Sequence, residues 1–249
     1  MIPKIIHYCW FGKNPLPKSA KKCISSWRKF LPDYEIKEWN ENNFDVNIIP
    51  YTKEAYEAKK YAFVSDYARF WILYKYGGLY FDTDVEIIRP IDDIITKGSF
   101  MGIEKGAYYN RAEMGELIRS VAPGLGMGAF EGLSIYKEVI DGYNEDHFFN
   151  VDGTYNTFTI VKRMTKVLYE HGYKGGESVE RIKDIWIYPA EYFCPFEQKT
   201  GKIEITENTR SIHHYDGTWL DNKGRMSLFI KKTFGGRFFD FLCKIKNIF

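Results

Sequence analysis

The chain has 249 residues, of which 45% are hydrophobic and 18% aromatic, enough for one large domain with a substantial core. Its formal net charge is only +2, so the overall charge does not indicate nucleic-acid binding. The four cysteines include no C-x-x-C pair, which favours reduced thiols over disulfides or a zinc site. No stretch approaches the roughly 18 apolar residues of a membrane-spanning helix. We therefore expect a cytoplasmic protein that does not bind nucleic acid.

The first half of the chain alternates between strand and helix patterns. Residues 2–10 predict a buried strand, residues 18–30 an amphipathic helix, and residues 34–39 a second strand. The longest helical pattern covers residues 53–76, and the two glycines that follow predict its end. This rhythm is typical of α/β nucleotide-binding folds.

The later patterns are shorter. We expect strands at 85–88 and 100–104, helices at 131–142 and 156–171, and strands at 185–188 and near Tyr192. We expect residues 85–88 to continue the main sheet. Seven glycines between residues 102 and 132 predict mobile loops over a pocket.

Acidic residues interrupt the aromatic and aliphatic run at 76–86. In an extended strand, Asp82 and Asp84 would point to the same side. Two neighbouring carboxylates repel each other unless a cation lies between them, so loss of Asp84 should not destabilise the metal-free protein. Carboxylate oxygens suit Mg²⁺ or Mn²⁺, whose coordination is often completed by substrate phosphates. An isolated D-x-D is more often a plain acidic strand end, so the prediction of a diphosphate site depends on its surroundings.

Two further segments carry polar residues of interest. Asp66 and Arg69 lie one helical turn apart, and such a pair is usually a weak surface ion pair. Their apolar neighbours indicate partial burial, for which a polar ligand is one reason. His213 and His214 would point to opposite faces of a strand, so only one of them could join the two carboxylates at a metal.

The excess of basic over acidic residues comes from the C-terminal end of the chain. From Lys223 to Phe249 there are seven Lys or Arg residues against one acid. We predict a catalytic domain over residues 1–222 and a basic amphipathic helical tail over residues 223–249. Residues 237–249 suit the plane of an anionic membrane surface, whereas the first part of the tail fits packing on the main domain equally well.

Together these segments resemble glycosyltransferase family 32, the D-x-D sugar transferases that include bacterial capsular and surface-polysaccharide enzymes and fungal mannosyltransferases. The resemblance lies in four segments that follow the order of the family, namely IPKIIHYCWFG at 2–12, SDYAR at 65–69, GGLYFDTD at 77–84 and HHYDGTW at 213–219. Thr218 stands where the family usually has Ser, and residues 104–180 match poorly.

The resemblance implies a GT-A type fold of the α/β class, with a Rossmann-like mixed sheet flanked by helices, and a nucleotide-sugar donor. It implies donor-binding roles for His7, Trp10, Asp66, Arg69, Gly78, Tyr80, Asp82 and Trp219. Asp82, Asp84 and His214 would bind the metal, Mn²⁺ or Mg²⁺. The catalytic residues would be Asp66, Asp82 and Asp84.

We therefore expect a retaining, metal-dependent bacterial glycosyltransferase. It would transfer a hexose from a nucleotide sugar, with UDP as the expected nucleotide, to a lipid-linked glycan acceptor. This reaction would belong to the synthesis of a surface polysaccharide. Two alternatives stay open. A haloacid-dehalogenase-like phosphatase has a similar D-x-D-x-[T/V] motif, from which Glu86 departs. A non-catalytic carbohydrate-binding module would need the metal but not the segments around Trp10 and Asp66.

Overall fold

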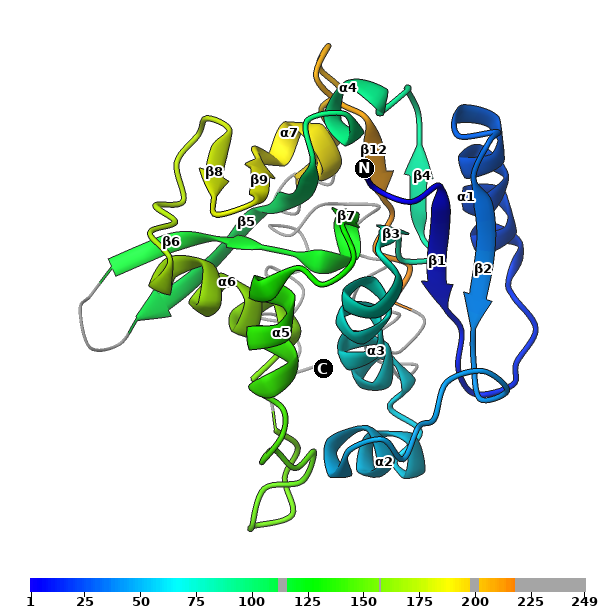
Figure 1. The fold of residues 1–249 in the computed structure, drawn as a ribbon, viewed down its shortest axis with the longest axis vertical. Helices are drawn as coiled ribbons and strands as arrows, with labels where there is room; N and C mark the ends of the chain where they lie inside the picture. Colours follow the sequence, from blue (N-terminus) through cyan, green and yellow to red (C-terminus); the bar gives the residue numbers. More distant parts are fainter. Residues whose placement is uncertain (112–115, 157, 198–201, 218–249) are drawn as a thin grey trace, which may run out of the picture.

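The structure is a computed structural model that describes residues 1–111, 116–156, 158–197 and 202–217 (Figure 1). Trp219, the predicted domain boundary at residue 222 and the predicted tail over 223–249 lie outside these residues. Within the described part of the chain, no helix combines the length and the apolar character needed to cross a bilayer.

Helices and strands alternate through the chain. The described helices are α1 (Lys18–Phe30), α2 (Pro50–Glu57), α3 (Tyr61–Tyr76), α4 (Asp92–Ile95), η1 (Pro123–Leu125, a 3₁₀ helix), α5 (Ser134–Asp141), α6 (Ile160–Glu170) and α7 (Ala190–Phe193). The described strands are β1 (Ile5–Cys9), β2 (Glu35–Trp39), β3 (Gly78–Tyr80), β4 (Val85–Ile87), β5 (Ser99–Arg111), β6 (Glu116–Val121), β7 (Met127–Ala129), β8 (Glu180–Ile182), β9 (Ile185–Tyr188), β10 (Phe196–Glu197), β11 (Lys202–Ile203) and β12 (Ser211–His213).

The central sheet is mixed. Among the described residues, eight strands form it in the order β2-β1-β3-β7-β5-β9-β8, and β6 pairs with β5. Strand β1 is parallel to both β2 and β3, whereas β7 is antiparallel to β3 and β5. Strand β5 is parallel to β9. The parallel β1–α1–β2 unit confirms the predicted order of strand, helix and strand at the start of the chain.

Neighbouring side chains on the central strands pack on opposite faces of the sheet, as the pleat of a strand requires. Tyr80 and Met101 belong to a core that α2, α3, α5 and α6 cover, with α3 and α5 side by side in Figure 1. Leu79 and Phe100 belong to a second core, covered by α1, α4 and α7. This confirms the predicted α/β class, with a Rossmann-like mixed sheet flanked by helices as expected of the GT-A type.

Helix α1 fixes the segment that follows the D-x-D sequence. Its Trp27 is fully buried and donates a hydrogen bond from Nε1 to the carbonyl oxygen of Val85, at 2.8 Å. The hydroxyl oxygen of Ser26 accepts a hydrogen bond of 2.9 Å from the backbone N–H of Ile87. Helix α1 therefore holds β4, and with it the residues beside Asp84, in a defined position.

Two of the predicted elements differ from the structure near the site. The helix expected at 53–76 is two helices, because the chain turns at Lys59, which has a φ of 58°. The side-chain periodicity continues across the break since α2 and α3 pack on the same core. Strand β4 does not extend the main sheet as expected but pairs with β12 in a separate two-stranded ribbon.

Two further predictions in the second half of the chain are also wrong. The segment near Tyr192 forms helix α7 rather than a strand. The glycine-rich segment expected to be loops forms much of the long antiparallel pair β5 and β6, in which the register shifts between Ile103 and Tyr108. Ile103, Ile118 and Val121 of this pair are buried in the core, whereas Tyr108 and Leu117 are exposed.

Candidate active site

A turn, rather than a strand, presents the two aspartates. Strand β3 ends at Tyr80 and β4 begins at Val85, and the backbone N–H of Val85 donates a hydrogen bond of 3.0 Å to the carbonyl oxygen of Asp82. The expected extended geometry at Asp82 and Asp84 is therefore wrong. The turn still brings the side chains together: one ligand atom each from Asp82, Asp84 and His213 all lie within 4.8 Å of one another.

A buried arginine joins α3 to this turn. Arg69 Nη2 lies 2.9 Å from Asp66 Oδ1, and its Nη1 lies 3.3 Å from Asp82 Oδ1. The Nε of Arg69 donates to the carbonyl oxygen of Ser65 at 3.1 Å. Burial raises the pKa of the Asp66 carboxyl to about 6, against the opposing effect of the Arg69 charge. Helix α3 therefore positions the guanidinium of Arg69 and the carboxyl of Asp66 beside the D-x-D turn.

Two neighbours hold Asp82 in place. The hydroxyl of Tyr80 donates to Asp82 Oδ1 at 3.2 Å, and the Arg69 guanidinium lies 4.9 Å from the centre of the Tyr80 ring. Gly124 lies against the other carboxylate oxygen, because a Cβ at this position would be 2.2 Å from Asp82 Oδ2. Any side chain at Gly124 would therefore displace Asp82. No local pattern linked this glycine to Asp82, because only the tertiary fold brings it to the site.

His213 reaches the turn from β12. Its Nε2 lies 3.1 Å from Asp84 Oδ1, and the backbone N–H of Asp216 donates to Asp84 Oδ2 at 2.9 Å. Burial by itself would raise the pKa of Asp84, but His213 and the backbone donors outweigh it and hold that pKa well below its ordinary value. Burial favours neutral His213, yet the charge of Asp84 raises its pKa. Because Asp84 has these partners, its loss should destabilise the metal-free protein, contrary to the expectation from repulsion alone.

The neighbouring histidine faces a different group. His214 Nε2 lies 2.8 Å from Glu86 Oε2, and Lys22 Nζ lies 3.1 Å from the other oxygen of Glu86. The expectation that one histidine of the pair faces the aspartates is correct, but the structure places His213 there and not His214. The register of β12 against β4, with His213 opposite Val85, sets this choice. The sequence offered no signal for that register.

Three residues expected to contact the donor are buried. His7 accepts a hydrogen bond at Nδ1 from Trp39 Nε1, at 3.0 Å, and its Nε2 pairs with the carbonyl oxygen of Gly77 at 3.0 Å. Gly78 and Tyr80 are likewise buried. These residues support the site from within the core, and their contact with a donor stays a prediction. A half-buried Trp10 donates its indole N–H to the carbonyl oxygen of Asn14.

The donor atoms fit a divalent cation. Two carboxylates and one imidazole are ligands of the kind that Mn²⁺ and Mg²⁺ accept, with open positions left for phosphate oxygens. The Nδ1 atom of His213 is buried without a hydrogen-bond partner among the described residues. His213 therefore makes its polar contact through the nitrogen that faces Asp84.

Part of the chain is similar in sequence to known glycosyltransferases. Residues 17–101 match the family described as "Glycosyltransferase sugar-binding region containing DXD motif". The chain is 35% identical over 102 residues to inositol phosphoceramide mannosyltransferase 3 of Schizosaccharomyces pombe, a match that covers 38% of this chain and 27% of that protein. It is 31% identical over 111 residues to inositol phosphoceramide mannosyltransferase 1 of the same organism, which covers 40% of this chain and 33% of that one.

Solved structures of glycosyltransferases are similar at low identity. The PaToxG glycosyltransferase is 18% identical, with a TM-score of 0.48, over 68% of this chain and 69% of that chain. A glycosyltransferase involved in glycosylation of the major capsid of PBCV-1 is 14% identical, with a TM-score of 0.48, over 90% of this chain and 97% of that one. The family match spans α1, α3 and both aspartates of the turn, so this segment is similar to the sugar-binding region of DXD-containing glycosyltransferases.

Proposed function

We propose that this protein is a metal-dependent glycosyltransferase that moves a hexose from a nucleotide sugar to a hydroxyl group of a glycan acceptor. The observation that carries the proposal is the convergence of Asp82, Asp84 and His213 beside the buried Asp66–Arg69 pair. The first three suit a cation that neutralises a diphosphate. The last two offer a carboxyl and a guanidinium to the hydroxyls of the sugar.

Asp82, Asp84 and His213 would hold the cation. A bound divalent cation would stabilise the negative charge that develops on the departing nucleoside diphosphate, which is the largest electrostatic demand of this reaction. Arg69 keeps Asp82 oriented, and the backbone N–H of Asp216 does the same for Asp84. The protein thus presents its ligands in fixed positions, which limits reorganisation during the reaction.

We propose that Asp66 and Arg69 orient the donor sugar and that transfer retains the anomeric configuration. In a same-face reaction, the acceptor oxygen forms a bond to the anomeric carbon as the bond from that carbon to the diphosphate oxygen breaks. The acceptor proton passes to the departing phosphate oxygen. This route requires no protein nucleophile, and none of the carboxyls described above is assigned that role.

We propose the donor and the acceptor as classes of compound. A UDP-hexose is the expectation from sequence, and the names of the two fungal relatives, both mannosyltransferases, add nucleotide-linked mannose to the donors worth testing. For the acceptor we propose a lipid-linked glycan of a bacterial surface or capsular polysaccharide. The enzyme would act in the cytoplasm, at the inner face of the cell membrane, with residues 237–249 as its contact.

A screen of nucleotide sugars tests this function. The melting temperature of the protein would be measured with UDP-, GDP- and CMP-hexoses, each with and without Mn²⁺, followed by an assay of donor hydrolysis. A ligand at 100 times its dissociation constant stabilises the protein by about 2.7 kcal/mol. Stabilisation and hydrolysis that both require Mn²⁺ support the proposal. Phosphate release from p-nitrophenyl phosphate, with no response to any nucleotide sugar, would instead favour the phosphatase alternative.

A further inference from the structure

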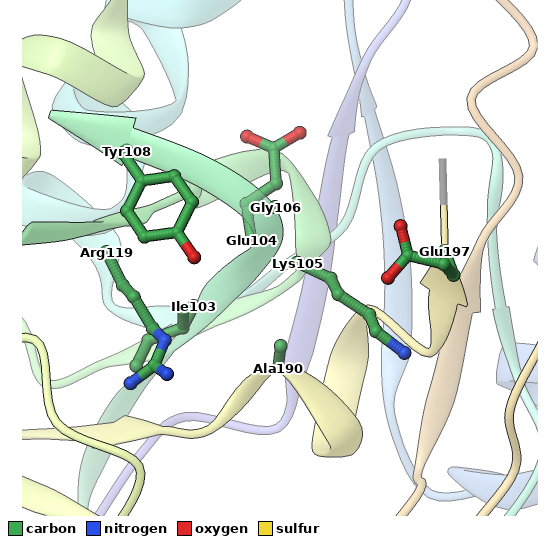
Figure 2. A pocket seen from close by; sticks show the side chains of 8 residues that line it. All are labelled: Ile103, Glu104, Lys105, Gly106, Tyr108, Arg119, Ala190 and Glu197. Atoms are coloured by element: carbon green, nitrogen blue, oxygen red, sulfur yellow. The ribbon is translucent and has the colours of Figure 1, made fainter. Parts of the chain in front are cut away.

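A pocket of about 270 Å³ lies where the β5–β6 pair meets α7. Figure 2 shows Tyr108 and Arg119 on one side of this pocket, Lys105 and Glu197 on the other, and Ala190 between them. The volume is slightly below the range of about 300–1,000 Å³ for pockets that hold drug-sized ligands. It therefore suits a ligand of about one sugar ring.

Glu104 connects this pocket to the metal-binding cluster. It lines the pocket, and its Oε1 accepts a hydrogen bond of 3.0 Å from the hydroxyl of Tyr215. The ring of Tyr215 meets the ring of His213 edge to face, with 4.1 Å between their centres. His213 in turn contacts Asp84. Three consecutive contacts therefore run from the wall of the pocket to the D-x-D turn.

The backbone of Tyr215 is unusual for a non-glycine residue. Its φ is 50°, in the left-handed region that an aromatic side chain rarely adopts. Its hydroxyl also lies 3.0 Å from Cys194 Sγ, so contacts on two sides hold the ring in this position. Strained residues of this kind persist where surrounding contacts require them, often at functional sites. Here the strained residue positions Glu104 relative to His213.

The polar groups of the pocket favour a neutral, hydroxyl-rich ligand over an anionic one. Arg119 pairs with Glu177 at 2.6 Å, and Lys105 pairs with Glu204, so acidic partners already offset both cations. Among the described residues, Tyr215 donates to Oε1 of Glu104 and none donates to Oε2. The Oε2 atom can therefore accept a hydrogen bond from a ligand. The half-exposed ring of Tyr108 offers a flat surface to the apolar side of a sugar.

We infer that this pocket is the acceptor site, that it binds one neutral sugar ring, and that Glu104 accepts a hydrogen bond from a hydroxyl of that ring. The inference rests on the proposed function, because it supplies the second substrate of that reaction. Glu104 orients the acceptor, whose reacting oxygen bonds to the anomeric carbon while its proton passes to the departing phosphate, as above. Glu104 itself neither gains nor loses a proton in this step.

The test compares transfer with hydrolysis in the full-length protein. The probes are methyl glucopyranoside, methyl galactopyranoside and methyl mannopyranoside, supplied with Mn²⁺ and the donor that the protein hydrolyses. Mass spectrometry then measures the ratio of disaccharide product to free sugar. The variants are Glu104→Gln, which keeps the acceptor oxygen for Tyr215, and Tyr108→Ala at the rim. Glu170→Gln, on the exposed surface of α6, is the matched control.

We expect the transfer-to-hydrolysis ratio to fall at least tenfold in Glu104→Gln and in Tyr108→Ala, and to stay unchanged in the control. The glycoside concentration for half-maximal transfer should rise in both pocket variants. An unchanged ratio in both, or no transfer to any probe by a wild-type protein that hydrolyses its donor, overturns the acceptor pocket while the proposed function stands. A wild-type protein with neither donor binding nor hydrolysis contradicts the proposed function itself. If Glu104→Gln does not fold, Tyr108→Ala decides.

Discussion

Replacing Arg69 with Met should destabilise the protein strongly, because it leaves two carboxylates near each other without their cation. The side chain of Arg69 is only 5% exposed, and those of its partners Asp66 and Asp82 are 16% and 30% exposed. Removing one partner of a buried ion pair costs about 3–5 kcal/mol. Because Asp82 is almost one-third exposed, solvent offsets part of this cost. We therefore expect a loss near the lower end, about 3 kcal/mol.

Urea denaturation at pH 7 in the presence of a chelator measures this loss. The control is Arg119→Met, whose ion pair with Glu177 has side chains that are 32% and 85% exposed. An exposed pair of this kind contributes less than about 1 kcal/mol. If Arg69→Met is no more destabilising than the control, water compensates for the loss of the guanidinium and Arg69 is not a structural support of the site.

Three further measurements test other parts of the structure. Burial lowers the pKa of His7 to about 4 from an ordinary 6.5, so the unfolded chain binds a proton before the folded protein does as pH falls. Between pH 6.5 and 4, the wild type should therefore lose about 3 kcal/mol of unfolding free energy relative to His7→Gln. Urea denaturation measures this loss, and an equal pH dependence of the two proteins would contradict it. His213→Ala should weaken Mn²⁺ binding at least tenfold more than His214→Ala in titration calorimetry, and equal or reversed effects would refute the assigned register. Truncation after Gly236 should abolish co-sedimentation with anionic liposomes but preserve transfer to a soluble acceptor; full-length protein that ignores such liposomes at low salt argues against docking through 237–249.

Local patterns predicted the parts of the site that are close in sequence. Asp66 and Arg69 share one face of a helix by spacing alone, and the apolar residues around them correctly indicated burial. The strand, helix, strand order at the start of the chain also followed from periodicity. These features need only a helix or a strand for their geometry, so a single sequence was sufficient.

The features that the sequence did not predict depend on contacts between distant segments. Whether His213 or His214 meets Asp84 depends on the pairing of β12 with β4. Gly124 lies against Asp82 because β7 pairs with β3 and brings η1 to the turn. Glu104 and Tyr215 are 111 positions apart, and no local spacing relates them. Pairing register and close approach arise from the whole fold, whereas periodicity reports only the neighbours of a residue.

Titration calorimetry with UDP and GDP, each with and without Mn²⁺, tests whether the D-x-D turn binds a nucleoside diphosphate through a cation. We predict that the wild type and the exposed control Asp33→Asn bind one of the two only when Mn²⁺ is present. In Asp84→Asn, which keeps the shape of the side chain but removes the charged ligand, Mn²⁺-dependent affinity should fall at least tenfold. Wild-type affinity in Asp84→Asn, or equal binding without the metal, would contradict the claim that the D-x-D turn holds the nucleotide through a cation.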